Sequence, residues 1–149
     1  MNPHCLGHVV FYVRDLERSL AFYRDLLGLR QVPSGGIAMP AAALTSGRTH
    51  HELLLIEVGD APGPLTGHRI GLYHVAFKMG DSLDELRAAR AELLAAGVHI
   101  DGMSDHTVSQ SLYLRDPDGN EVEVYVDDPA VDWAANPELV LSPIRPLSL

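Results

Sequence analysis

The chain has 149 residues, of which 46% are hydrophobic and 21% are charged, a balance typical of one globular domain with a buried core. Its net charge of −9, from 20 acidic and 11 basic residues, argues against a partner bound through phosphate groups, such as nucleic acid. No apolar run approaches the roughly 20 residues that span a membrane. The single Cys5 and an N-terminus unlike a secretory signal favour a cytoplasmic, reducing compartment.

The first half of the chain is typical of a strand followed by a helix. A β-rich run covers His8 to Val13, and Asp15 follows it as a residue type that often caps helix N-termini. Apolar residues then recur at helical spacing as far as Leu27, and Gly28 marks the end of the predicted helix. The β-type stretch "HHELLLIEV", residues 50–58, closes this half.

The second half repeats this pattern. A predicted strand covers Tyr73 to Met79, Ser82 and Glu85 stand in capping-box positions, and Gly97 ends the predicted helix. Two β-type stretches, "SQSLYLRD" and "NEVEVYVD", then follow, joined through the turn-forming sequence of residues 116–119. The same order of elements therefore occurs twice.

We predict an α+β fold in which a βαβββ module is used twice within a single domain, residues 1–149. Module 1 covers about residues 4–58 and module 2 about residues 70–128. Neither module has enough apolar surface to fold alone, so we expect the two to pack together in one domain. The Gly- and Pro-rich residues 59–69 form the linker between them. The tail, residues 129–149, is expected to pack on the body as extended chain or a short helix.

Polar residues occupy one face of several predicted strands. Because strand residues two apart share a face, His8 and His74 point away from the helix side at equivalent positions of the repeat. Glu123 lies opposite the valines of its strand, and Glu121 shares its face, so alternation alone does not rank these two carboxylates. Two imidazoles and one carboxylate suit a divalent iron site with open positions. The alternative is that these residues have no functional role. Strand histidines are often structural, and alternating Glu and Val residues are typical of a strand with one face exposed to solvent.

Three stretches together resemble the vicinal oxygen chelate superfamily, which includes glyoxalase I, bleomycin-resistance proteins and the type I extradiol dioxygenases. They are "HVVFYVRDLERSLAFYRDLLGL", "YHVAF" and "RDPDGNEVEVYVD", and the resemblance covers residues 6–128. It implies paired βαβββ modules that form a cup-shaped mixed sheet around one metal. It also implies that His8, His74 and Glu123 are the metal ligands.

Two further stretches are similar to the extradiol dioxygenases within that superfamily. "HHELLLIEV" places His51, and "DHTVSQSLYLRDPDGN" places His106 and Tyr113, at positions that match catalytic residues of those enzymes. The resemblance implies that His51 moves a substrate proton, Tyr113 hydrogen-bonds a catechol oxygen, and His106 positions the substrate or stabilises charge. A regular strand would point residues seven apart to opposite faces, so a loop or bulge is expected between His106 and Tyr113.

The implied activity is an Fe(II)-dependent extradiol ring-cleaving dioxygenase that acts on a catechol-type aromatic with O2. Mn(II) or another divalent metal is the alternative ion, and a homodimer is left open. If Glu57 or Glu52 also reached the metal, the chain would be closer to a glyoxalase-like isomerase or lyase. A third alternative is a resistance protein that binds a drug or another small molecule without turning it over. The ring substituents and the position of cleavage stay open.

Overall fold

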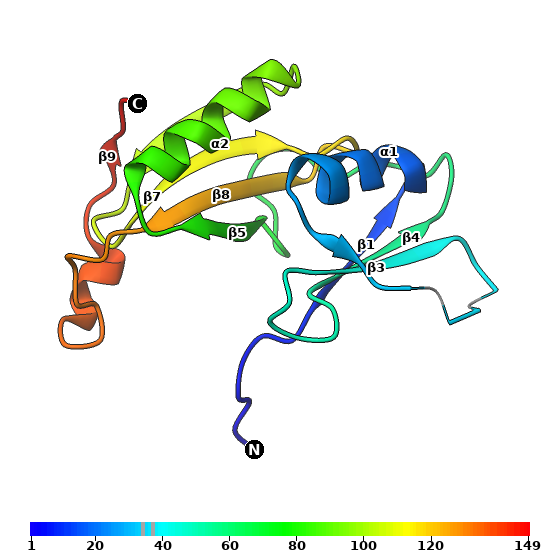
Figure 1. The fold of residues 1–149 in the computed structure, drawn as a ribbon, viewed down its shortest axis with the longest axis horizontal. Helices are drawn as coiled ribbons and strands as arrows, with labels where there is room; N and C mark the ends of the chain where they lie inside the picture. The colour runs from blue at the N-terminus through cyan, green and yellow to red at the C-terminus, as the bar shows by residue number, and fades with distance from the viewer. Residues whose placement is uncertain (34, 37) are drawn as a thin grey trace. The chain divides into compact units, whose positions relative to one another are not determined.

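The computed structural model describes residues 1–33, 35–36 and 38–149, and it divides the chain into two compact units, Met1–Pro64 and Leu65–Leu149. Each unit is built around its own mixed sheet with few helices (Figure 1). The predicted α+β class is therefore confirmed. Among the described residues, every helix is too short or too polar to cross a bilayer.

Unit 1 is a βαβββ module. Its elements are β1 (Val9–Val13), α1 (Leu16–Leu20), η1 (Ala21–Leu26), β2 (Arg30–Gln31), β3 (Ala41–Thr45) and β4 (Leu53–Glu57). The sheet order is β1-β4-β3-β2, and β1 runs parallel to β4 while the other pairs are antiparallel. Phe11 and Val13 are buried and Tyr12 is exposed, which is the alternation expected of a strand with one core face. Asp15 caps α1 by accepting a hydrogen bond from the Arg18 amide at 2.8 Å.

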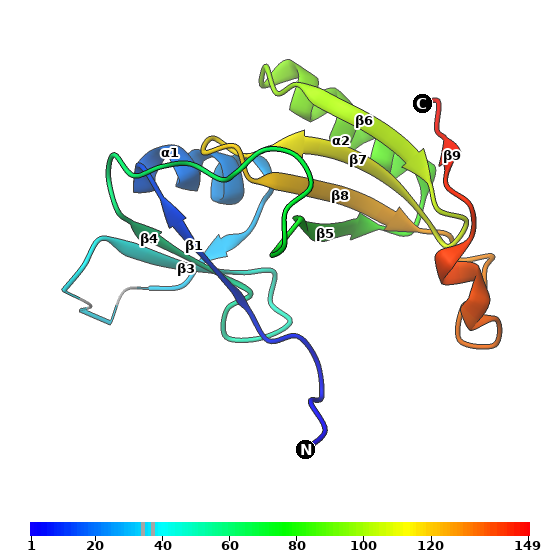
Figure 2. The same cartoon turned by 180° about the vertical axis from the view of Figure 1, so that it is seen from behind.

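Unit 2 repeats the module and adds a strand. Its elements are β5 (His74–Gly80), α2 (Leu83–Ala95), β6 (Ile100–Asp105), β7 (Ser109–Arg115), β8 (Glu121–Asp127), η2 (Pro137–Leu141) and β9 (Arg145–Pro146). The sheet order is β5-β8-β7-β6-β9, again with the first pair parallel. Helix α2 lies along one face of this sheet and contacts β5, β7 and β8 (Figure 2). Leu86 and Leu93 of α2 are buried, as are Val122, Val124 and Val126 of β8.

The boundaries of several strands differ from the sequence-based expectation by one to three residues, and at β1 and β4 the difference affects candidate site residues. The first strand begins at Val9 and not at His8, and β4 begins only at Leu53, so His51 lies before the strand that was expected to hold it. The reason is a turn ahead of β4, in which the Glu52 carboxylate accepts a hydrogen bond from the Ser46 amide at 2.9 Å. No regular element occupies residues 58–73, and the division between the units after Pro64 falls within the expected linker.

The tight turn between β7 and β8 fixes the register of the strands that hold the candidate site. The Asp116 carboxylate accepts hydrogen bonds from the amides of Asp118, at 2.9 Å, and Asn120, at 2.8 Å. Gly119 adopts a φ of 91°, a conformation that favours glycine. The resulting register places Tyr113 directly opposite Glu123.

The N-terminus of α2 offers a stability test. The Ser82 hydroxyl accepts a hydrogen bond from the Glu85 amide at 3.3 Å and donates one to the Glu85 carboxylate at 2.7 Å. Ser82→Ala is expected to lower the free energy of unfolding by about 1 kcal/mol, because these groups lose their partner. Ser82→Asp keeps a capping acceptor and is the matched control. Urea denaturation checks both variants, and an alanine variant as stable as the parent would contradict the capping role.

The C-terminal tail is held against unit 2 by a short strand pair and an ion pair. β9 pairs with the end of β6, and Arg145 donates to the Asp105 carboxylate at 2.9 Å. The Thr107 amide donates to the other oxygen of Asp105 at 2.7 Å. The hydrogen bond from Thr107 first, and then the charge of Arg145, hold the pKa of Asp105 below its ordinary value despite partial burial.

This lowered pKa predicts an acid-sensitive tail. A carboxylate whose pKa is lowered by folding stabilises the protein above its unfolded pKa of about 3.9, and that contribution is lost as the pH falls through the folded value. We expect Asp105→Asn to cost about 1 kcal/mol at neutral pH and to flatten the loss of stability below about pH 4. Urea denaturation at a series of pH values measures both effects. Parallel pH profiles for variant and parent would rule out a contribution from Asp105.

Candidate metal centre

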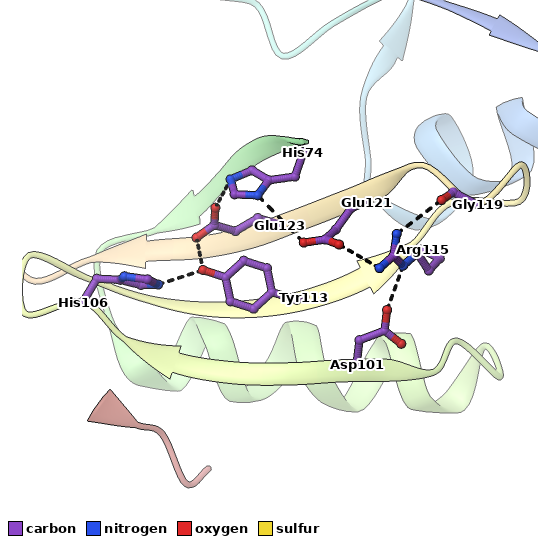
Figure 3. A network of polar contacts seen from close by, with 8 residues as sticks. All are labelled: His74, Asp101, His106, Tyr113, Arg115, Gly119, Glu121 and Glu123. Atoms are coloured by element: carbon purple, nitrogen blue, oxygen red, sulfur yellow. Dashed lines mark hydrogen bonds and ion pairs between the residues drawn. The ribbon is translucent and has the colours of Figure 1, made fainter. Parts of the chain in front are cut away.

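The six residues singled out by the sequence are divided between the two units. His8 and His51 belong to unit 1, whereas His74, His106, Tyr113 and Glu123 belong to unit 2. The structure brings the unit 2 residues together as one polar network (Figure 3). It also brings His8 and His51 together within unit 1.

His74 and Glu123 are the central pair of unit 2. His74 is the first residue of β5, and Glu123 lies on β8, the parallel neighbour of β5. The Nε2 atom of His74 lies 3.0 Å from Oε2 of Glu123 (Figure 3). Both side chains are largely buried, with exposed fractions of 28% and 12%. Their placement follows from the strand alternation, since the opposite parity of β8 carries the buried valines.

Tyr113 and His106 extend this pair. The Tyr113 hydroxyl donates to Oε1 of Glu123 at 3.3 Å, and Nε2 of His106 lies 2.7 Å from the same hydroxyl (Figure 3). Burial, followed by the nearby charge of Glu123, raises the pKa of Tyr113 to about 12, so the phenol stays protonated at neutral pH. It can therefore act as a hydrogen-bond donor.

A turn explains how residues seven apart can meet. His106 directly follows β6 and Tyr113 lies on β7, so the two stand on adjacent arms of a hairpin. Thr107 adopts a φ of 73°, a left-handed conformation uncommon for a residue other than glycine, and it reverses the chain. The loop expected between the two residues is present.

Glu121 and Glu123 have different surroundings although they share a strand face. Oε2 of Glu121 lies 2.7 Å from the Arg115 guanidinium, which also donates to Asp101 at 2.9 Å (Figure 3). Glu123 is instead the carboxylate that contacts Nε2 of His74. Sequence reasoning missed Arg115 and Asp101. The usable signal was the opposite charge of Arg115 and Glu121 at the two ends of the tight turn, where they form a cross-strand pair.

Unit 1 holds a cluster of three histidines, His8, His50 and His51. The rings of His8 and His51 have centroids 4.4 Å apart, and Nδ1 of His51 lies 2.5 Å from Nδ1 of His50. Burial first, and then the neighbouring imidazoles of His8 and His50, lower the pKa of His51. A neutral imidazole at neutral pH can accept a proton, as a general base requires.

Comparison with known proteins decides the family. Residues 5–124 match the model of the Glyoxalase/Bleomycin resistance protein/Dioxygenase superfamily. The chain belongs to this superfamily. The superfamily is metal-dependent, and its name covers glyoxalases and dioxygenases as well as resistance proteins. Membership therefore fixes the fold and leaves the reaction open.

Individual relatives within the superfamily include two dioxygenases and a lyase. The chain is 36% identical over 134 residues to the catechol-2,3-dioxygenase of Bacillus subtilis, which covers 89% of this chain and 45% of that protein. It is 34% identical to biphenyl-2,3-diol 1,2-dioxygenase 3 of Rhodococcus globerulus, covering 83% of this chain and 63% of that protein. The chain thus spans about half to two thirds of these relatives. A lactoylglutathione lyase structure from Agrobacterium tumefaciens is 26% identical with a TM-score of 0.59, covering 85% of this chain and 96% of that one.

The donors of unit 2 fit a metal of the kind that this superfamily uses. Two ligands about 2.1 Å from an octahedrally coordinated ion, at right angles, stand about 3.0 Å apart. The 3.0 Å between Nε2 of His74 and Oε2 of Glu123 matches this separation. Among the described residues, no group of three His, Cys, Asp or Glu side chains forms a metal-binding cluster. The distance is compatible with two metal ligands, and the binding of a metal by His8, His74 and Glu123 stays a prediction.

The carboxylates considered for a glyoxalase-type fourth ligand have structural partners within unit 1. Oε2 of Glu57 accepts a hydrogen bond from the Leu16 amide, at 2.8 Å, at the start of α1. Glu52 holds the turn before β4 and lies 3.4 Å from the Arg48 guanidinium. Each carboxylate therefore has a local role that needs no metal.

Proposed function

We propose that the chain is an Fe(II)-dependent extradiol dioxygenase that opens the ring of a catechol-type aromatic with O2. The proposal depends mainly on one observation, the series of polar contacts in unit 2 that runs from His106 through Tyr113 and Glu123 to His74. This series joins a pair of ligand-type side chains to a protonated phenol, and a protonated phenol is a suitable donor for a catechol oxygen. The names of the two dioxygenase relatives, which specify vicinal diols, support the choice of substrate class.

We propose that His8, His74 and Glu123 hold the metal, with Fe(II) as the ion and Mn(II) as the alternative. A single carboxylate leaves the bound ion with a net positive charge, and two neutral imidazoles complete a ligand set typical of oxygen-activating iron. Fe(II), when bound, supplies the positive charge that favours a deprotonated catechol and the redox chemistry that allows O2 to react with it. The chain itself supplies the orientation and the proton movements.

His51 is proposed to move the substrate proton. Its Nδ1 faces His50, which leaves Nε2 to accept a proton from a catechol hydroxyl and to return it later in the reaction. The lowered pKa of His51 keeps this nitrogen available at neutral pH. No net proton is consumed, because the ring-fission product is the sum of catechol and O2.

Tyr113 and His106 are proposed to act on the substrate as donors. The Tyr113 hydroxyl stands between Glu123 and His106, so a catechol oxygen near Glu123 lies within reach of the phenol proton. His106, 2.7 Å from that hydroxyl, sets the direction in which the phenol donates and places an imidazole near developing negative charge.

We also propose that the protein is cytoplasmic and assembles as a homodimer.

The lyase relative provides the main alternative, because this chain covers 96% of the lactoylglutathione lyase but less than half of the catechol dioxygenase. The deciding experiment is to purify the protein anaerobically, measure its metal and then assay it with two classes of substrate. Catechols with O2 should give a coloured ring-fission product and no reaction should occur with a glutathione hemithioacetal. Turnover of the hemithioacetal alone would establish the lyase. Tight binding of small molecules by protein that holds no metal would establish a sequestering role.

A further inference from the structure

His74 has a second ring nitrogen that the proposed metal centre does not use. Its Nε2 faces Glu123, whereas its Nδ1 is buried and has no hydrogen-bond partner within the part of the chain that the structure describes. A buried polar atom without a partner is costly, and such atoms are rare in folded proteins. Histidines that bind a metal through one nitrogen usually donate the other N–H to a carboxylate or a carbonyl.

Glu121 stands next to this nitrogen. It is the cross-strand partner of His74, and its Oε1 lies 3.9 Å from Nδ1 of His74 (Figure 3). Its side chain is only 8% exposed. Oε2 of the same carboxylate is held by Arg115 at 2.7 Å, and Arg115 is held in turn by Asp101 at 2.9 Å. One carboxylate oxygen is thus fixed and the other is turned toward the imidazole.

We propose that Glu121 is a positioning residue that orients His74 by accepting the proton of its Nδ1. The inference rests on the proposed function, because it concerns the use of His74 as a ligand. The gap of 3.9 Å is longer than a hydrogen bond and too short for an intervening water, so the proposed hydrogen bond requires a small rotation of the His74 ring toward Glu121. With the proton held on Nδ1, the lone pair of Nε2 is free for a metal.

The two carboxylates of β8 therefore take different roles. Glu123 meets the nitrogen that binds the metal, whereas Glu121 meets the nitrogen that carries the proton. The ion pair with Arg115 gives Glu121 its fixed direction, and the hydroxyl of Tyr73 also hydrogen-bonds to this carboxylate. A strand with alternating glutamates thus provides one ligand and one support for the neighbouring ligand.

The test uses Zn(II) as the probe, measured without any turnover. We expect Glu121→Gln to weaken Zn(II) binding by about 10- to 100-fold, the range typical of partners that orient a ligand. In Zn(II)-loaded protein with 15N-labelled histidine, the Nδ1 proton resonance of His74 should move upfield as its hydrogen bond weakens. Asp127→Asn is the matched control, because Asp127 lies on the same strand face and pairs only with the exposed Lys78 among the contacts of the described residues. It should bind Zn(II) like the parent.

The possible results distinguish a wrong positioning role for Glu121 from a wrong assignment of the metal centre. If Glu123→Gln loses Zn(II) while Glu121→Gln binds it like the parent with an unmoved proton resonance, the positioning role is wrong and the metal centre stands. If the parent protein binds no divalent metal, both are wrong. If circular dichroism shows that Glu121→Gln does not fold, Glu121→Asp takes its place, because aspartate keeps the charge but shortens the side chain. Parent-like Zn(II) affinity of Glu121→Asp, together with an unmoved proton resonance of His74, would also overturn the proposal.

Discussion

Replacing Glu123 with glutamine is expected to remove the bound metal and reduce ring cleavage by at least about 1,000-fold, because the variant loses the negative ligand on which the proposed centre depends. Glutamine keeps the size of the side chain, and its carbonyl oxygen can still accept the hydrogen bond from Tyr113. The fold should therefore survive. Metal analysis after anaerobic reconstitution and steady-state turnover with catechol measure the two effects.

The matched control for this prediction is again Asp127→Asn. It removes a carboxylate from the same strand face, four residues away, where the partner is the exposed Lys78. The control should keep its iron and its turnover. An iron-replete, active Glu123→Gln protein would show that the carboxylate is not a ligand and that the contact with His74 at 3.0 Å is only structural.

Changing His51 to alanine is expected to leave the iron content nearly intact while turnover falls by about 100- to 10,000-fold, the contribution typical of a positioned general acid and base. The reason is that His51 is proposed to carry a proton and not to bind the ion. Iron content and turnover with catechol are measured on the same preparation, and a pH profile of turnover should lose the limb that depends on the neutral imidazole of the parent.

His50→Ala is the matched control, since His50 is the exposed neighbour that contacts the same ring. Its effect on turnover should be much smaller than that of His51→Ala. Loss of iron from the His51 variant would make His51 a ligand and would replace the assignment of His8, His74 and Glu123 proposed above.

The fold could be read from the sequence because its local signals agree with one another. The spacing of apolar residues in the two helices, Asp15 and Ser82 as caps, and the turn at residues 116–119 each indicate the same repeated module. The short strands β2 and β9 had no such signal, since two residues are too few for any periodicity. β4 starts late because side-chain hydrogen bonds in the preceding turn compete with strand pairing.

Only part of the candidate site could be predicted from the sequence, and the reason is geometric. Alternation places Glu121 and Glu123 on one face but says nothing about which carboxylate meets which nitrogen of His74. That distinction depends on the register of β5 against β8 and on Arg115, whose pairing with Glu121 exists only once the hairpin has formed. His106 and Tyr113 likewise meet only because the chain reverses at Thr107.

The stoichiometry of one reaction decides whether this protein is an extradiol dioxygenase. Iron-loaded protein is mixed with catechol, and the O2 consumed, the mass of the product and its visible absorption are measured together. An extradiol dioxygenase must consume one O2 for each catechol and release a coloured product heavier than the catechol by the mass of one O2. Intact catechol in the presence of a full complement of iron, or a product that has gained no oxygen, would show that the protein is not an extradiol dioxygenase.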